Sequence, residues 1–260
     1  MRNPLSKKVT ELEPSGIRKF FDIVNEMKDA ISLGVGEPDF DTPWRIREEG
    51  IYSLERGRTF YTSNAGLKDL KEEIVKYLER KIHVSYDPAD VLVTVGGSEA
   101  IDMAFRAMLD EGDEVLVPQP SYVSYVPCAK LADGVPVVIQ LKEENEFKLT
   151  AEELEAAIAP RSKILVMPFP NNPTGSVMTE EDLRPLVDVI IRHDLFVVSD
   201  EIYSELTYQG DHVSIASFPG MKERTVVING FSKGFAMTGW RLGYACGPRE
   251  ILEQMTKIHQ

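Results

Sequence analysis

Residues 225–246 have the sequence TVVINGFSKGFAMTGWRLGYAC, and this stretch decides the fold. It begins with the apolar run Thr225–Asn229 and ends with the apolar run Leu242–Cys246. Both runs are short and rich in apolar or β-branched residues, which is typical of a strand that is buried on both faces. The polar residues between the runs, with Ser232 and Lys233 first among them, are therefore expected at one edge of a sheet.

Five more apolar runs of this kind precede residue 225. They are Val91–Val95, Glu114–Val117, Val135–Ile139, Lys163–Met167 and Phe196–Ser199. Segments with helical spacing lie at 45–56, 67–81, 98–109, 121–132, 151–158 and 179–192, and another begins near Pro248. Strands that alternate with helices predict an α/β fold, here a mostly parallel seven-stranded sheet sandwiched by helices. Ligands bind such sheets beyond the carboxyl ends of the strands.

The composition excludes several classes of protein. With 42 acidic and 29 basic residues the formal net charge of the 260-residue chain is −13, which disfavours binding to nucleic acids and to anionic membranes. Hydrophobic residues make up 43%, which is enough for a substantial core and argues against a mainly disordered chain. No apolar run reaches the roughly 18 residues of a membrane span. The first residues lack the apolar core of a signal peptide, so we expect a cytoplasmic protein.

The cysteine content limits the covalent and metal chemistry. The chain has two cysteines, Cys128 and Cys246, far apart in the sequence. A disulfide framework and a CxxC metal knuckle are therefore excluded, and we expect no metal site.

Lys233 lies between Ser232 and Arg241 in the opening stretch. An amine beside a hydroxyl and a guanidinium suits a ligand with both a carbonyl and a phosphate, because the amine can react with the carbonyl while the other two groups hold the phosphate. A surface lysine and a structural arginine would explain this stretch taken alone. Three further motifs, however, each follow an apolar run: Gly96-Gly-Ser-Glu-Ala100, Asn171-Asn-Pro-Thr-Gly175 and Asp200-Glu-Ile-Tyr203. Four motifs at strand ends predict one shared ligand site.

With these motifs the chain resembles the class I/II pyridoxal-phosphate-dependent aminotransferases, which are the fold type I enzymes of the aspartate aminotransferase superfamily. The resemblance runs from Gly36-Glu-Pro-Asp-Phe40 to the last residue. It implies pyridoxal 5′-phosphate as the cofactor, amino acids and 2-oxo acids as substrates, and a homodimer with shared active sites. It also implies an N-terminal arm and part of a small domain at 1–44 and a large cofactor-binding domain at 45–260. The chain is expected to stop before most of the C-terminal small domain, where the family carries the arginine for the substrate α-carboxylate.

The resemblance assigns the reacting group to Lys233, which would bond to the cofactor and then act as the general base. Asp200 would pair with the protonated pyridine nitrogen, because a carboxylate favours the cationic ring that accepts electrons. Asn172 and Tyr203 would donate hydrogen bonds to the phenolate oxygen of the ring.

For the cofactor phosphate, the resemblance implies binding by Gly97, Ser98, Glu99, Ser232 and Arg241. Gly97 and Ser98 open a helix, and the free backbone N–H groups of a helix N-terminus favour an anion. Glu99 would contribute only its backbone N–H, because its carboxylate would repel a phosphate.

Two tyrosines complete the site that the resemblance implies. Tyr122 matches the aromatic residue that stacks on the cofactor ring, and Tyr61 matches the tyrosine that reaches the phosphate of the neighbouring subunit. Simple packing roles for both tyrosines remain alternatives. Substrate binding is implied for Gly36, whose backbone would lie near the substrate carboxylate, together with Tyr122 and Asn172.

The function implied by the resemblance is transfer of an amino group between an L-amino acid and a 2-oxo acid such as 2-oxoglutarate. The reaction would be ping-pong, with an amino acid of the aspartate, alanine or aromatic type. Two alternatives stay open. A C–S β-lyase on the same fold would use the same cofactor residues but release pyruvate and a thiol. The chain could also be a non-catalytic cofactor-binding fragment or regulator, although its charge of −13 speaks against a DNA-binding regulator.

Overall fold

The computed structural model describes residues 2–13 and 36–260. Its strands are β1 (Val91–Thr94), β2 (Glu114–Gln119), β3 (Val135–Gln140), β4 (Ser162–Met167), β5 (Phe196–Asp200), β6 (Thr225–Gly230) and β7 (Gly243–Cys246). They form one sheet in the order β1-β7-β6-β5-β4-β2-β3. All neighbours from β6 to β3 pair in parallel, whereas β7 is antiparallel to both β1 and β6. The predicted seven-stranded, mostly parallel sheet is confirmed.

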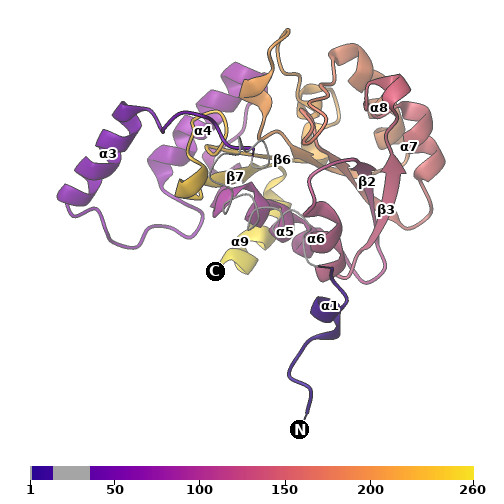
Figure 1. The fold of residues 1–260 in the computed structure, drawn as a ribbon, viewed down its shortest axis with the longest axis horizontal. Coiled ribbons are helices and arrows are strands. Elements are labelled where there is room, and N and C mark those ends of the chain that lie inside the picture. Colours follow the sequence, from indigo (N-terminus) through magenta and orange to yellow (C-terminus); the bar gives the residue numbers. More distant parts are fainter. Residues whose placement is uncertain (1, 14–35) are drawn as a thin grey trace, which may run out of the picture.

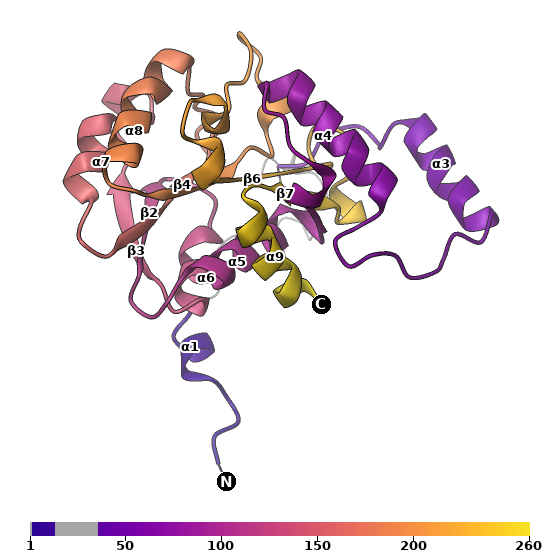
Figure 2. The ribbon, with the colours of Figure 1, turned by 180° about the vertical axis from the view of Figure 1, so that it is seen from behind.

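Helices cover both faces of this sheet. The α-helices of the described residues are α1 (Lys7–Thr10), α3 (Trp44–Glu55), α4 (Lys68–Ile82), α5 (Gly96–Met108), α6 (Tyr125–Leu131), α7 (Ala151–Ala157), α8 (Glu180–Arg192) and α9 (Arg249–His259). Figure 1 shows α5, α6 and α9 on one face and α4, α7 and α8 on the other, and Figure 2 shows the same layers from behind. Helix α3 stands apart at one end of the molecule and has no buried residue. Residues 14–35, a large part of the predicted N-terminal arm, lie outside the described residues.

Strand β4 illustrates why the apolar runs are continuous. Ile164 and Val166 pack into the core cluster on the α5 side, whereas Leu165 and Met167 pack into the cluster on the α8 side. Successive side chains of a strand point to opposite faces, so a strand covered on both faces needs apolar residues at every position. The alternating-element pattern of the sequence therefore predicts the three layers.

Strand β3 corrects the expectation that every run is buried on both faces. Val135 and Val138 are 46% and 48% exposed, and only Ile139 of this strand is fully buried. The reason is topological, because β3 is an edge strand that pairs only with β2.

Helix α6 also differs from its expected span of 121–132. It begins at Tyr125, because residues 121–124 form a loop that continues the end of β2.

The sheet and helix α5 meet most closely at Gly243. A Cβ atom at this position would lie 2.6 Å from the carbonyl carbon of Gly96 and 2.7 Å from the backbone nitrogen of Gly97. Both neighbours are backbone atoms at the start of α5, so they cannot rotate away. Only glycine allows the first residue of β7 to contact the helix N-terminus at this distance.

We expect Gly243→Ala to lower the free energy of unfolding by about 2 kcal/mol, because the new methyl group displaces backbone that is already packed. Urea unfolding followed by circular dichroism measures this difference. Gly239→Ala is the matched control, since a Cβ there has no neighbour within 4 Å. Equal stability of the two variants would contradict the close approach.

Both cysteines are free thiols. Cys246 is buried. Cys128 is half-buried, and burial raises the pKa of its thiol to about 11, so its reactive thiolate form is disfavoured. Across residues 2–13 and 36–260, no helix is long and apolar enough to cross a membrane.

Candidate functional site

A cavity of about 400 Å³ opens at the carboxyl ends of β2, β4, β5 and β6. Most of the residues singled out from the sequence line it: Gly36, Gly97, Ser98, Tyr122, Asn172, Asp200, Tyr203, Ser232, Lys233 and Arg241. The topology explains this convergence. Each motif follows a strand that runs in the same direction as β6, and this includes β1. Arg241 instead precedes β7, which runs in the opposite direction and so begins at the same edge.

Asp200 is the last residue of β5 and is only 7% exposed. Its Oδ2 accepts a hydrogen bond of 2.8 Å from the Tyr125 hydroxyl, and its Oδ1 accepts a longer bond of 3.3 Å from the backbone N–H of Ile202. Burial raises the pKa of Asp200, and the bond from Tyr125 opposes that shift. A cation placed beside this carboxylate would remove the cost of its burial, so the site favours a positively charged group.

Lys233 lies at the same edge of the sheet as Asp200, just after the neighbouring parallel strand β6. Burial is the main cause that lowers the pKa of its ammonium, and the nearby Arg241 lowers it further, whereas Glu37 raises it. The Lys233 ammonium donates a hydrogen bond to the Gly36 carbonyl oxygen and lies 5.5 Å from the centre of the Tyr203 ring. A lowered pKa increases the fraction of neutral amine, which is the form that attacks a carbonyl.

The N-terminus of α5 forms the third part of the cavity. Gly97 and Ser98 present the first turn of this helix, where backbone N–H groups have no partner within the helix. The Ser98 Oγ lies 3.1 Å from the Tyr122 hydroxyl oxygen, and the Ser232 side chain is buried nearby in the same cavity wall. This end of the cavity combines hydroxyls with free N–H groups.

Arg241 brings a positive charge to the same helix N-terminus. Its backbone has a φ of 55°, and its guanidinium donates a hydrogen bond of 2.9 Å to the Thr238 carbonyl oxygen. A Cβ atom at Gly96 would lie only 2.5 Å from Nη2 of Arg241, so glycine is needed for the guanidinium to sit against the helix. Guanidinium, hydroxyls and helix N-terminus together form an anion site.

Glu99 turns its carboxylate away from this site. One carboxylate oxygen accepts a hydrogen bond from the backbone N–H of Val95, and the other lies 3.1 Å from Nδ1 of His259. Among the described residues, the cavity wall includes Gly97 and Ser98 but not Glu99. The carboxylate is therefore engaged elsewhere, and a contact of the Glu99 backbone N–H with a ligand stays a prediction.

Tyr61 does not lie in the cavity. It is fully exposed in the segment between α3 and α4. Its role in a neighbouring subunit stays a prediction, because the structure describes one chain.

Tyr125 is the site residue that the sequence reasoning missed. It fixes the Asp200 carboxylate, and its ring packs edge-on against Tyr122 with centroids 5.7 Å apart. No spacing in the sequence marks Tyr125, because Tyr122 lies in the loop before α6 and the bond to Asp200 joins separate elements of the fold. Within the described residues, no cluster of three or more metal-ligating side chains is present.

The cavity fits pyridoxal 5′-phosphate by the chemistry of its walls. The buried Asp200 carboxylate suits a cationic ring nitrogen, the Lys233 amine suits a carbonyl, and the start of α5 with Arg241 suits a phosphate. The Tyr122 ring and the Asn172 amide line the same cavity, where they can meet the face and the oxygen substituent of the ring.

Comparisons with known proteins agree with this chemistry. The family model for aminotransferase class I and II matches residues 28–260. The chain is 51% identical to the Bacillus subtilis protein YugH, whose name as an aminotransferase is provisional, over 100% of this chain and 68% of YugH. It is 47% identical to an aspartate aminotransferase of Pyrococcus abyssi, over 98% of this chain and 66% of that protein. It is 43% identical to aromatic-amino-acid aminotransferase 2 of Thermococcus litoralis, over 98% and 66%.

Solved structures give the same result. The aspartate aminotransferase from Thermus thermophilus with maleate superposes with a TM-score of 0.94 at 40% identity, covering 100% of this chain and 68% of that chain. The aromatic aminotransferase from Pyrococcus horikoshii superposes with a TM-score of 0.87 at 44% identity, covering 92% and 65%. The chain thus spans about two thirds of the length of the relatives it matches.

Proposed function

Because this chain belongs to the aminotransferase class I and II family, we propose that the protein is a pyridoxal-phosphate-dependent aminotransferase. The observation that carries the proposal is one cavity that holds both a lysine with a lowered pKa and a buried aspartate. The cofactor, when bound, supplies an electron-withdrawing ring next to the reacting carbon. The protein supplies the groups that hold this ring and move the proton.

Lys233 and Asp200 have the two central roles in this proposal. Lys233 Nζ would hold the cofactor at its carbonyl and would carry a proton to and from the substrate α-carbon. Asp200 would stay ionised beside the ring nitrogen, and Tyr125 orients its carboxylate. Neither group needs to move far, since both already line the cavity.

The remaining residues bind and orient. Asn172 and Tyr203 would donate to the oxygen substituent of the ring, and Tyr122 would stack on its face. The phosphate takes the anion site, where its contacts would be Gly97, Ser98, the Glu99 backbone N–H, Ser232 and Arg241.

We propose an L-amino acid and a 2-oxo acid as the substrates, exchanged in a ping-pong reaction. The names of the relatives support an amino acid of the aspartate or aromatic type. Gly36 lies against Lys233, so its backbone is suited to contact the substrate carboxylate. The proposed domain division keeps residues 45–260 as the cofactor-binding domain and assigns residues 1–44 to the arm and part of the small domain.

We further propose a homodimer in which Tyr61 of each chain reaches the phosphate site of the other. The full exposure of its ring supports this arrangement, because a large aromatic side chain at that exposure has room for a partner. Sedimentation of the chain with bound pyridoxal phosphate should give the mass of a dimer. The shared site would be contradicted if the unaltered chain sediments as a monomer and the Tyr61→Ala variant binds pyridoxal phosphate with the same affinity as the unaltered chain.

An absorbance titration tests the proposed function. The purified chain should develop a visible band with pyridoxal phosphate, and L-aspartate, L-glutamate or L-tyrosine should replace this band by one near the ultraviolet. The corresponding 2-oxo acid should appear in an amount equal to that of the bound cofactor. A band that none of these amino acids changes would favour a non-catalytic cofactor-binding chain over an active aminotransferase. Release of pyruvate and a thiol from cystathionine would favour the β-lyase.

A further inference from the structure

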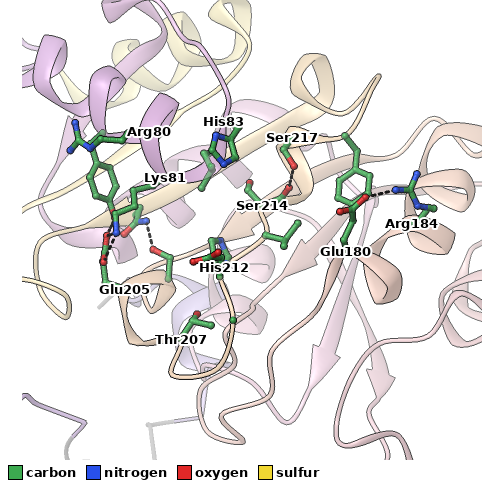
Figure 3. A pocket seen from close by; sticks show the side chains of 18 of the residues that line it. Arg80, Lys81, His83, Glu180, Arg184, Glu205, Thr207, His212, Ser214 and Ser217 are labelled. Carbon is green, nitrogen blue, oxygen red and sulfur yellow. Dashed lines mark hydrogen bonds and ion pairs between the residues drawn. The ribbon is translucent and has the colours of Figure 1, made fainter.

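A second cavity has a volume of about 680 Å³, and Figure 3 shows side chains that line it. Its walls are the last turn of α4, the first turn of α8 and the loop 204–219. Among the described residues, none lines both cavities. The segment 200–205 separates them, because Asp200 and Tyr203 face the cofactor cavity whereas Ser204 and Glu205 face the second one.

Glu201 is buried inside this separating segment and is only 1% exposed. Its Oε1 accepts hydrogen bonds from the hydroxyls of Ser199, at 2.9 Å, and Ser214, at 2.6 Å. Its Oε2 lies 2.9 Å from Nε2 of His212. The backbone N–H of Glu201 donates a bond of 2.8 Å to the Ile228 carbonyl oxygen of β6. A buried carboxylate is tolerated because three donors satisfy it.

These bonds attach a returning loop to the end of β5. Ser214 and His212 come more than ten residues after Glu201, and the Ser214 hydroxyl also accepts a bond of 3.2 Å from the backbone N–H of Ala216. His212, whose side chain is 10% exposed, lines the second cavity and is the outermost of these partners (Figure 3). Without the carboxylate, two hydroxyls and an imidazole would be buried without an acceptor, and the loop would have to shift.

The side chain of Glu201 does not face the cofactor. Successive residues of a strand end point to opposite sides, so Asp200 faces the cofactor cavity, whereas Glu201 lies on the other side of the sheet beside Met167 and Leu183. Whatever Glu201 does for the cofactor therefore acts through the backbone that carries Asp200 and Tyr203.

We propose that Glu201 is a positioning residue, whose bonds to Ser199, Ser214 and His212 hold the strand end so that Asp200 and Tyr203 keep their places at the cofactor. This inference rests on the proposed function, since it requires that the cavity bind pyridoxal phosphate. The other end of the segment 200–205 has its own support, since the Asn229 amide donates a hydrogen bond of 3.0 Å to the Ser204 hydroxyl. Glu201 holds the backbone next to Asp200, whereas Tyr125 holds the Asp200 carboxylate itself.

The test compares Glu201→Ala with Glu201→Gln, using pyridoxal phosphate as the probe. The alanine variant should bind it on the order of tenfold more weakly, as is usual when a supporting residue behind a ligand contact is lost. Its visible absorption maximum at saturation should also shift, because Asp200 and Tyr203 sit differently against the ring. The glutamine variant keeps an acceptor oxygen for both serines and should retain most of the affinity and the original maximum.

Leu154→Ala is the control for lost stability. Leu154 is fully buried in α7 and lines neither cavity, so its truncation should lower the melting temperature without moving the absorption maximum. If Glu201→Ala does not fold, His212→Ala takes its place. It removes a single hydrogen-bond partner of Glu201 and should also shift the visible absorption maximum. An unshifted maximum in the variant that folds overturns the proposal. Failure of the unaltered chain to bind pyridoxal phosphate overturns this inference together with the proposed function.

Discussion

Lys233→Ala is expected to abolish covalent attachment of pyridoxal phosphate and to lower turnover by a factor on the order of 10⁴, since the variant loses both the amine and the general base. Ser98, Ser232 and Arg241, which line the cavity and are the proposed phosphate ligands, remain in this variant, so the cofactor should still bind without a covalent bond. Borohydride reduction followed by peptide mass spectrometry measures the attachment. The unaltered chain should carry the added mass on the peptide that contains Lys233.

Lys130→Ala serves as the matched control, because this lysine is exposed on α6, away from the cavity. It should leave both attachment and turnover unchanged. A Lys233→Ala chain that still turns over, or one that carries the reduced cofactor stoichiometrically on another lysine, would remove Lys233 from its proposed role.

Asp200→Asn is expected to cut turnover by a factor on the order of 10³, because an amide cannot favour the cationic ring nitrogen as a carboxylate does. The shape of the site should persist, since the amide oxygen can still accept the bond from Tyr125. Steady-state kinetics with a saturating amino acid and 2-oxo acid measures the loss. Turnover that equals that of the unaltered chain would contradict the pairing.

The same substitution should have the opposite effect on the stability of the cofactor-free chain. Burial raises the pKa of Asp200 above its ordinary value of 3.8, so ionisation of this group opposes folding. As the pH rises from below 3.8, the unfolded chain loses its proton first, and the folded chain loses stability until its own raised pKa has been passed. At pH 7 the unaltered chain bears the full cost, which the amide avoids.

Asp200→Asn should therefore be more stable than the unaltered cofactor-free chain at pH 7, and this advantage should vanish as the pH falls below 3.8. Urea unfolding of both proteins at several pH values measures the difference. A variant that is less stable at pH 7 would mean that the carboxylate stabilises the fold, contrary to the direction of its pKa. Lower turnover together with higher stability of the cofactor-free chain would show that the Asp200 carboxylate serves the reaction at the expense of folding.

The strands and the chemistry of the site could be predicted from local patterns. Runs such as Ile164–Met167 are apolar at consecutive positions because both faces of the central strands are covered, and this requirement is visible in the sequence. The motifs around Asn172, Asp200 and Lys233 follow such runs directly, so their position at one edge of the sheet follows from the rule for parallel strands.

The order of the strands could not be predicted in this way. The runs at Val135 and Ile164 look alike in sequence, yet β3 lies at the edge and exposes Val138, whereas β4 is central. A strand's local pattern reports its preference for burial but not which neighbours will pair with it. Pairing depends on how all the helices and strands pack together.

The sequence alone therefore determined the type of sheet, the edge at which ligands bind and the chemical groups presented there. Only the tertiary structure decided which partners each group has. The Tyr125 hydroxyl reaches Asp200 across 75 positions of the chain, and His212 reaches Glu201 from a loop that returns to the end of its strand. Such contacts leave no period or spacing in the sequence, because they arise where separate elements meet, and they set the charge and position of the groups that the motifs supply.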